Sequence, residues 1–424
     1  MKKYTRDYFT RDRIRIGVWD YLAPLSNRKS MEQLRDMGVD MILHGSATTD
    51  PEVRERTLTL ADELGIEVIV DDLYIGDGGS GRRWSDEEIE AFDFKAMVAP
   101  YEHHPCFSGN HIIDEHGLRD FDWVAKIANK YEKDTGKLGY INLLPKYANA
   151  KQLTGGASQD EIEIFESDSK LFDHYNDEYC RLYNMSYIST DVYPLKIRDG
   201  KMYTYRDYAE ALNQVARSGK KHGKDFWCCV QAFSWKHETV RNPIEGECRW
   251  QCYCVLSFGC KCIGLYSYAG AEGYTQCPAV VDQISWEPTE RYYYWKPVLW
   301  EIRNISDAYV QYRHLGAFGV NASDDVPYLK MTEEYKVFTA ISDLRTKDPL
   351  LFGCFAHKSE AAHAFTVVNM HDFSKPAKAT LQFAAEGRVI SHQGGKALEL
   401  TPENGVYTIT LEQGEGAFVE VLQK

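Results

Sequence analysis

Phe107-Ser-Gly-Asn-His-Ile-Ile-Asp-Glu115 is the stretch of sequence that decides the fold. It combines a short apolar strand with two acidic residues at its end. An amphipathic helix follows, with Trp123, Val124 and Ile127 on its apolar face, and stops near Gly136. A buried strand followed by a helix is the repeating unit of proteins built on parallel sheets. The stretch therefore predicts a parallel strand with polar residues at its C-terminal end.

The same alternation of strand and helix occurs eight times along the chain. Two helix starts are marked by local signals, Asp50-Pro51 and the capping box Ser85-x-x-Glu88. Longer helices are expected at about 159–184 and 289–312. Eight such units predict a (β/α)8 barrel, since no Gly-x-Gly-x-x-Gly follows the first strand to favour a doubly wound dinucleotide fold. The expected strands are Ile14–Asp20, Val39–His44, Ile66–Asp72, Phe107–Glu115, Leu138–Leu144, Met185–Tyr193, Phe226–Trp235 and Lys261–Tyr268.

After about residue 316 the pattern changes to strands without helices. Turn signals separate the strands, including Gly394-Gly395 and Asn404-Gly405. We therefore predict that residues 1–315 form the barrel and residues 316–424 form a small antiparallel β-sandwich. The strands expected in this part are 335–341, 350–357, 364–369, 379–383, 406–411 and 417–422.

Charge and hydropathy exclude several classes of protein. The 424 residues carry a net charge of −14, and no Lys/Arg cluster forms the basic face that nucleic acid requires. Lys220-Lys221 end an expected helix, where cations suit the helix dipole. No apolar run reaches about 18 residues, so no membrane span is expected. The N-terminus lacks the apolar core of a signal peptide.

Cysteine usage indicates a reducing compartment. The chain has 11 cysteines, and seven crowd into one apolar stretch between Cys228 and Cys262. An odd number of crowded cysteines would risk scrambled disulfides outside the cell, so we expect a cytoplasmic protein with buried thiols. Cys252-x-Cys254 and Cys260-x-Cys262 lack the two-residue gap of a zinc knuckle.

The C-terminal strand ends of a barrel carry its chemistry, and here they combine carboxylates, amides and aromatic rings. Sugars suit this mixture, because their C–H faces stack on rings and their hydroxyls pair with carboxylates and amides. Acidic residues at such junctions can also simply cap the next helix, and His44 can be a hydrogen-bonded core histidine. The residues concerned are Trp19, Asp20, His44, Asp71, Asp72, Asp114, Glu115, His116, Asn142, Asp191, Tyr193, Gln231, Trp235, Tyr266 and Tyr268, with Glu272 in the following loop.

Glu115 is the best candidate for a catalytic acid. Glycoside hydrolysis needs one protonated and one ionised carboxyl group. Asp114 is a like charge beside Glu115, and the apolar Ile112-Ile113 precede it, so both features should raise the pKa of Glu115. Trp235 and Tyr268 are the expected sugar platforms.

Five motifs together resemble the large clan of retaining (β/α)8 glycoside hydrolases, in particular the family-42 β-galactosidase-like barrels. The resemblance covers about residues 12–315. It implies that Glu115 is the acid/base, with Asp114 where the clan usually has Asn. It also implies a nucleophilic Glu at the end of strand seven, where this chain has Gln231, which cannot be a nucleophile. The motifs are Ile112-Ile-Asp-Glu-His116, Tyr140-Ile-Asn-Leu-Leu-Pro145, Thr190-Asp-Val-Tyr-Pro194, Val230-Gln-Ala-Phe-Ser234 and Glu247-Cys-Arg-x-Gln251.

The partner of Glu115 therefore has three possible sources. Asp191 is the first, and we favour it. Asp114-Glu115 also resembles the paired acids of hexosaminidases that use the substrate's acetamido group. Finally, Glu247 or Glu272 could reach the site from a loop.

We therefore expect an intracellular glycoside hydrolase that acts on small oligosaccharides or glycosides, needs no cofactor and can form homo-oligomers. Glu115 and Asp191 are its predicted catalytic residues. One alternative is a catalytically silent sugar-binding barrel; another is a metal-dependent barrel hydrolase or isomerase using His44, Asp71, Asp72 and Glu115. The predicted substrate-binding residues are Asp20, His44, Asp72, Asp114, Asn142, Tyr193, Gln231, Trp235, Glu247, Tyr268 and Glu272.

Overall fold

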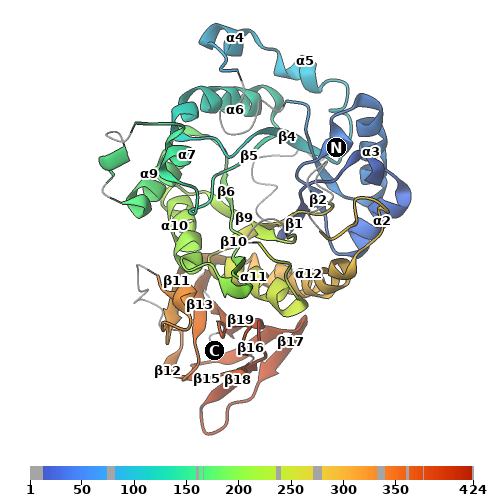
Figure 1. The fold of residues 1–424 in the computed structure, drawn as a ribbon. Helices are drawn as coiled ribbons and strands as arrows, with labels where there is room; N and C mark the ends of the chain where they lie inside the picture. Colours follow the sequence, from blue (N-terminus) through green and yellow to red (C-terminus); the bar gives the residue numbers. More distant parts are fainter. Residues whose placement is uncertain are drawn as a thin grey trace.

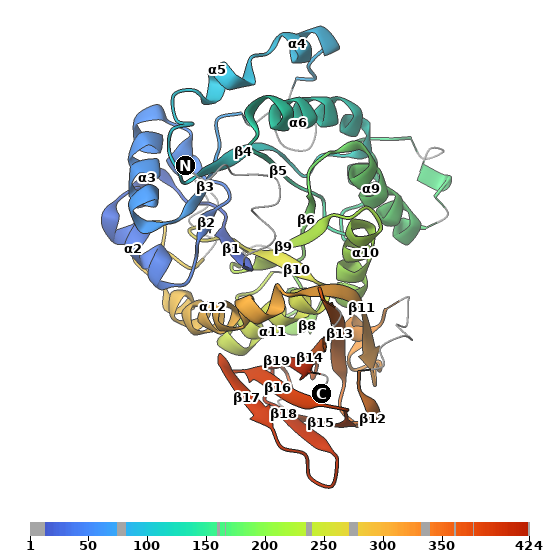
Figure 2. The same cartoon turned by 180° about the vertical axis from the view of Figure 1, so that it is seen from behind.

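The structure is a computed structural model, and Figures 1 and 2 show it from opposite sides. It describes residues 13–73, 82–158, 162–165, 167–234, 240–270, 279–331, 340–359, 362–375 and 377–422.

Eight parallel strands form the barrel, in the order β5-β4-β3-β2-β1-β10-β9-β6. A parallel bridge between Leu143 and Thr190 joins the two ends of this sheet, and the Leu143 amide donates to the Ser189 carbonyl at 2.9 Å. The sheet is therefore closed, which confirms the barrel and excludes the doubly wound alternative. The strands are β1 (Arg15–Val18), β2 (Met41–Ile42), β3 (Glu67–Val70), β4 (Phe107–Asp114), β5 (Leu138–Asn142), β6 (Tyr187–Asp191), β9 (Asp225–Gln231) and β10 (Cys260–Tyr266).

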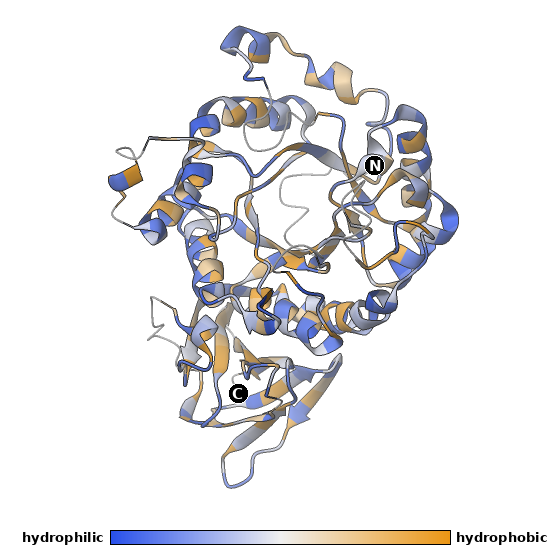
Figure 3. Cartoon of the chain, in the orientation of Figure 1, coloured by the Kyte–Doolittle hydropathy of each residue, from blue (hydrophilic) through white to orange (hydrophobic). Residues whose placement is uncertain are grey.

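Helices surround the barrel, and along each of them apolar and polar residues alternate (Figure 3). The expected caps are present: Asp50 accepts bonds from the amides of Glu52 and Val53, and Ser85 and Glu88 form a capping box. These caps satisfy amides that the first helical turn leaves without partners. The helices are α2 (Arg28–Asp36), α3 (Pro51–Leu64), α4 (Asp86–Ala91), α5 (Phe94–Val98), α6 (Phe121–Thr135), α7 (Ala150–Thr154), α9 (Asp168–Leu182), α10 (Tyr208–Lys221), α11 (Glu245–Ser257) and α12 (Glu290–Tyr309).

Several element boundaries differ from the prediction, and one hairpin was not predicted. Helix α9 begins at Asp168 rather than near residue 159, because the Ser167 side chain caps it there by accepting from the Lys170 amide. Strand β9 ends at Gln231, although an apolar pattern continues to Ser234. An unpredicted hairpin of β7 (Leu195–Arg198) and β8 (Lys201–Thr204) follows β6.

The C-terminal part is an antiparallel sandwich, as predicted. Its sheets have the orders β11-β13-β14-β19-β16-β17 and β12-β15-β18, and an apolar cluster that includes Phe365 and Phe383 fills the space between them. The sequence missed β11, β12, β16 and β17, and the expected strand 335–341 falls mostly outside the described residues. The strands are β11 (Tyr312–Val320), β12 (Ser342–Arg345), β13 (Leu350–His357), β14 (Ala362–Asn369), β15 (Ala379–Ala384), β16 (Arg388–Gln393), β17 (Lys396–Leu400), β18 (Tyr407–Leu411) and β19 (Gly416–Leu422).

The sandwich packs against α11 and α12 of the barrel (Figure 1). The Tyr309 ring lies 5.3 Å from Phe355 and 5.5 Å from Phe418. A Cβ atom at Gly353 would lie 2.2 Å from the Ser257 carbonyl oxygen, so the backbone of β13 touches the end of α11. Strand β11 spans the predicted boundary after residue 315, and the division into two domains there stays a prediction.

Ten cysteines fall at described positions, and all ten are buried and free. Among the described residues, no helix combines the length and the apolar character needed to cross a membrane.

Candidate active site at the barrel mouth

A cavity of about 280 Å³ opens at the C-terminal ends of the barrel strands. This is the end at which barrel enzymes carry their chemistry. Three carboxylates and five aromatic rings are among its lining residues. These residues are Trp19, Asp114, Glu115, Asn142, Tyr147, Asp191, Tyr193, Lys196, Cys229, Phe233, Val240 and Tyr266.

Asp114 and Glu115 reach the cavity from the end of β4. Asp114 lies in register with Asn142 of β5, and the Glu115 amide donates to the Asn142 carbonyl at 3.0 Å. Glu115 then leaves the strand with φ at +48°, a left-handed conformation that is uncommon for a residue with a side chain. Such backbone strain clusters at functional sites, where the surrounding structure holds it in place.

Asp191, at the end of β6, is almost fully buried in the same cavity. Its carboxylate accepts bonds from Asn142 Nδ2 at 3.0 Å and from the Tyr147 hydroxyl at 3.2 Å. Burial raises the pKa of Asp191 to about 6, although hydrogen bonds from Asn142, Tyr147 and Tyr193 act in the opposite direction. Asp191 therefore changes its protonation state close to neutral pH.

An aromatic wall faces these carboxylates. Tyr193 and Tyr266 stack with ring centroids 5.4 Å apart, and Phe233 meets Tyr266 edge-on at 5.0 Å. Lys196, from the β7–β8 hairpin, places its ammonium 4.8 Å from the centre of the Tyr147 ring. Rings of this kind can stack on the C–H faces of a sugar.

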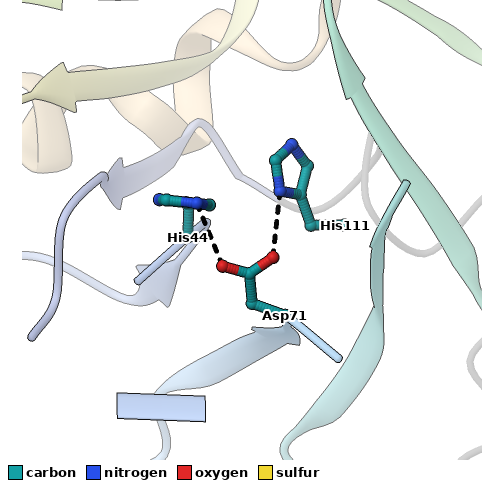
Figure 4. A group of neighbouring side chains, drawn as sticks. All are labelled: His44, Asp71 and His111. Carbon is teal, nitrogen blue, oxygen red and sulfur yellow. Dashed lines mark hydrogen bonds and ion pairs between the residues drawn. The ribbon is translucent and has the colours of Figure 1, made fainter. Parts of the chain in front are cut away.

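His44, Asp71 and His111 form a second polar cluster (Figure 4). His44 and Asp71 lie just after β2 and β3, and His111 lies inside β4. Asp71 contacts His44 Nε2 at 3.0 Å with one oxygen and His111 Nδ1 at 3.1 Å with the other. Asp20, with φ at +58°, lies 3.7 Å from Nδ1 of His44. Burial lowers the pKa of His44, but Asp20 and Asp71 outweigh it and raise that pKa to about 10. His44 is therefore an imidazolium at neutral pH, and the Trp19 ring stacks on it at 4.7 Å.

Asp72 does not join this cluster. Its carboxylate binds Tyr101, Asn110 and Arg54, at 2.9, 2.5 and 3.0 Å. The metal set expected from the sequence is therefore not assembled, since Asp72 lies elsewhere and His111 takes its place beside Asp71.

Gln231 does not line the cavity. Its side chain is fully buried, its Oε1 accepts from the Leu195 amide at 2.9 Å, and its Nε2 donates to the carbonyls of Leu195 and Arg241. At the position where the sequence resemblance implied a nucleophile, an amide thus ties the β7 hairpin to the barrel.

Asp20, His44 and Asp72 are not among the cavity-lining residues either. Four further predicted substrate-binding residues lie apart from the cavity or outside the described residues. Glu247 is buried at the start of α11 and pairs with Arg241. Tyr268 is buried with its ring 5.8 Å from Tyr21. Trp235 and Glu272 are outside the described residues. Asp114, Asn142 and Tyr193, in contrast, line the cavity together with Glu115 and Asp191.

The sequence did not single out Tyr147, Lys196, Phe233, Val240 or His111. Tyr147 lies in the loop after β5 and Lys196 in the hairpin strand β7 after β6, so both follow a barrel strand end by five residues. His111 lies inside β4, where alternation points it into the barrel.

No protein-family model matches the chain, and no curated protein matches its sequence. Its structure is similar to that of Gan42B, a GH42 β-galactosidase from G. stearothermophilus, with a TM-score of 0.54 and 10% identity over 98% of this chain and 100% of that one. A catalytic mutant of Gan42B gives a TM-score of 0.50 with 9% identity over 99% and 100% of the two chains. The β-galactosidase from Bacillus circulans sp. alkalophilus gives 0.49 and 10%, over 97% and 100%. At such identities the likeness shows a shared fold: a barrel followed by a β-domain.

Proposed function

We propose that this protein is a glycoside hydrolase that acts on small oligosaccharides or glycosides. One observation carries the proposal: Glu115 and Asp191, from strands β4 and β6, line the same aromatic-walled cavity. Two carboxyl groups across a sugar site are what glycoside hydrolysis requires. The likeness to β-galactosidases is consistent with this chemistry but does not define the substrate.

Glu115 acts as the general acid and donates its proton to the leaving oxygen of the glycosidic bond. Asp191 is the second carboxylate, either a base that activates water or a nucleophile that attacks the sugar. With a pKa near 6, Asp191 is ionised at neutral pH and can perform either role. Tyr147 and Asn142 hold its two oxygens and so fix the direction in which it acts.

The size of the cavity supports a substrate that inserts a single sugar ring. Its volume of about 280 Å³ lies at the lower limit for small-molecule sites. We expect Asp114 to bind its hydroxyls and the Tyr193–Tyr266 stack to bind its apolar face. The Trp19 ring lines the cavity and also stacks on the cationic His44.

Hydrolysis of a panel of aryl and natural glycosides, read as released sugar, tests the proposal. We expect turnover of at least one glycoside, and loss of it in Glu115→Gln with binding of the sugar preserved. Thermal shifts with the same sugars without any released product would contradict the proposal and favour a silent sugar-binding barrel.

The anomer of the first product, followed by NMR, distinguishes the two roles of Asp191. Retention requires the two carboxyl groups to lie roughly 5–5.5 Å apart, whereas inversion needs roughly 6.5–9.5 Å to admit a water molecule.

The cluster of His44, Asp71 and His111 favours a second candidate function, that of a metal-dependent hydrolase or isomerase. Its potential ligand atoms lie within 4.8 Å of one another, and two neutral imidazoles with a carboxylate suit a divalent transition metal, which would have to displace the proton of His44. Metal analysis of the purified protein separates the candidates. Stoichiometric metal, and activity that is lost with chelator and with His111→Ala, would support this candidate over the first.

A further inference from the structure

A second cavity, of about 350 Å³, opens at the opposite end of the barrel. Five basic side chains and a single acidic one, Asp225, are among its lining residues. This is a strong local excess of positive charge in a chain with a net charge of −14. The basic residues are Lys220, Lys224, Lys261, Arg313 and Lys358.

These residues come from separate parts of the fold. Lys220 lies in the last turn of α10, and Lys261 is the second residue of β10. Arg313 belongs to β11, which lies beside α10 in both views (Figures 1 and 2). Lys358 follows β13, so the cavity joins the barrel to the β-sandwich. Lys261 and the mouth residue Tyr266 are five residues apart along β10, a separation of about 16 Å.

Lys261 lines this cavity and is only 8% exposed. Its ammonium lies 4.4 Å from the centre of the Tyr309 ring and 3.5 Å from the Tyr312 carbonyl, a long and weak hydrogen bond. Burial lowers the pKa of Lys261 to about 8; the charge of Asp225 opposes this shift, and that of Lys358 acts in the same direction as burial. A buried ammonium is costly unless anions neutralise it, and Asp225 is the one acidic residue among the described residues that line this cavity, beside five basic ones.

Two neighbouring groups also have pKa values that burial and nearby positive charges lower. Burial and the charge of Arg313 lower the pKa of Lys220. Burial, with the charges of Lys220 and Lys261, lowers the pKa of His314 to about 3. His314 is drawn close because Gly259, at φ +84°, has no Cβ; one built there would lie 2.7 Å from the His314 Cβ. The positive charges thus converge on one small space.

We propose that this cavity binds a phosphate group, either inorganic phosphate or that of a small phosphorylated metabolite. Lysines serve proteins as point charges for phosphate, and each ammonium has three donors, so Lys220 and Lys261 can bind a ligand while holding one backbone carbonyl each. A cavity of this size also has room for a small organic group beside the phosphate. The site does not depend on the proposed function.

Such a ligand would bridge the two parts of the molecule. It would contact Lys220 and Lys261 of the barrel, and Arg313 and Lys358 beyond it. Binding therefore stabilises their junction, and the melting temperature should rise with ligand concentration.

Titration of the full chain with inorganic phosphate, glucose 6-phosphate and glucose tests the proposal, by calorimetry and by melting temperature at pH 7 and constant ionic strength. We expect both phosphates to bind and to raise Tm, and glucose and chloride to do neither. Tighter binding of glucose 6-phosphate would identify a phosphorylated metabolite as the ligand; equal binding would identify free phosphate. A rise in Tm that chloride reproduces would overturn the proposal.

Variants localise the site. Lys358→Ala removes an exposed charge and should weaken phosphate binding about tenfold, the worth of one charged hydrogen bond. Lys261→Met removes the buried ammonium and should weaken phosphate binding at least as much. Lys396→Ala, which removes an exposed lysine of β17 outside the cavity, is the matched control and should bind as the wild type does. Unchanged affinity in both pocket variants, or equal loss in the control, would overturn the proposal.

Discussion

The two ends of the barrel carry opposite charges and are built in opposite ways. The mouth collects Asp114, Glu115 and Asp191 from the ends of strands, whereas the far cavity collects lysines and an arginine from a helix end, a strand start and the β-sandwich. Each end buries a titratable group, Asp191 or Lys261, whose pKa burial moves towards neutral. Burial makes an ionised group costly. The charge at each end therefore lowers the stability of the fold, and at each end it lies where a ligand can bind to it.

Asp191→Asn should produce the largest effect. Loss of the second carboxylate should lower kcat by about 10³-fold or more on the substrate found by screening. The same change should stabilise the fold by up to about 3 kcal/mol at pH 7, because it removes a buried charge. Activity assays and denaturant unfolding measure the two effects, and an inactive variant that is also clearly destabilised would break the comparison.

The pH dependence gives the same test in the wild type. The folded-state pKa of Asp191, about 6, lies above its ordinary value, so the folded protein binds this proton more tightly than the unfolded chain. This contribution makes stability fall as pH rises from about 4 to about 6, and the fall should be smaller in Asp191→Asn.

Gln231→Glu should destabilise the protein by about 3 kcal/mol without restoring a retaining mechanism. A carboxylate there would face the carbonyls of Leu195 and Arg241, which now accept hydrogen bonds from the amide. Urea unfolding and turnover assays check this. Gln231→Leu is the matched variant, which tests loss of the bonds without adding charge, and a gain of activity in Gln231→Glu would show that this side chain does reach the sugar.

Lys261→Met is the counterpart of Asp191→Asn at the far end. In phosphate-free buffer at pH 7 it should be more stable than the wild type by roughly 1–2 kcal/mol, because a poorly compensated ammonium is replaced by an apolar side chain. The folded-state pKa of Lys261, about 8, lies below its ordinary value. Wild-type stability should therefore gain from this group as pH rises from about 8 to about 10.5, and the variant should lack that gain.

Tyr147→Phe should produce the smallest effect. The Tyr147 hydroxyl donates to ionised Asp191 and lowers its pKa, so its removal should raise that pKa by about one unit. The acidic limb of the profile of kcat/KM against pH should move upward accordingly. Tyr205→Phe, which alters the ring packed edge-on against Tyr147, is the control and should leave the limb in place.

The sequence predicted the mouth far better than the far cavity, for a physical reason. Strand ends can be read from hydropathy, and a barrel brings them all to one face, so Glu115, Asn142 and Asp191 could be placed together in advance. In the sequence, the position of Lys220 near a helix end was enough to account for it. Lys261 lines the same cavity but is 41 positions away in a different element, so the sequence did not indicate that the two lysines lie together. The bonds of Gln231 could not be predicted, because nothing in the sequence showed the hairpin that its amide holds.

The most direct test of the central claim compares Glu115→Gln with Asp191→Asn on aryl glycosides of good and poor leaving groups. An acid is needed only where the leaving group must be protonated. We predict that Glu115→Gln loses about 100-fold or more in kcat/KM on poor leaving groups but little on dinitrophenyl glycosides, whereas Asp191→Asn loses activity on both. Equal losses of Glu115→Gln on both kinds of substrate, or full activity in either variant, would contradict the roles assigned to these two carboxyl groups.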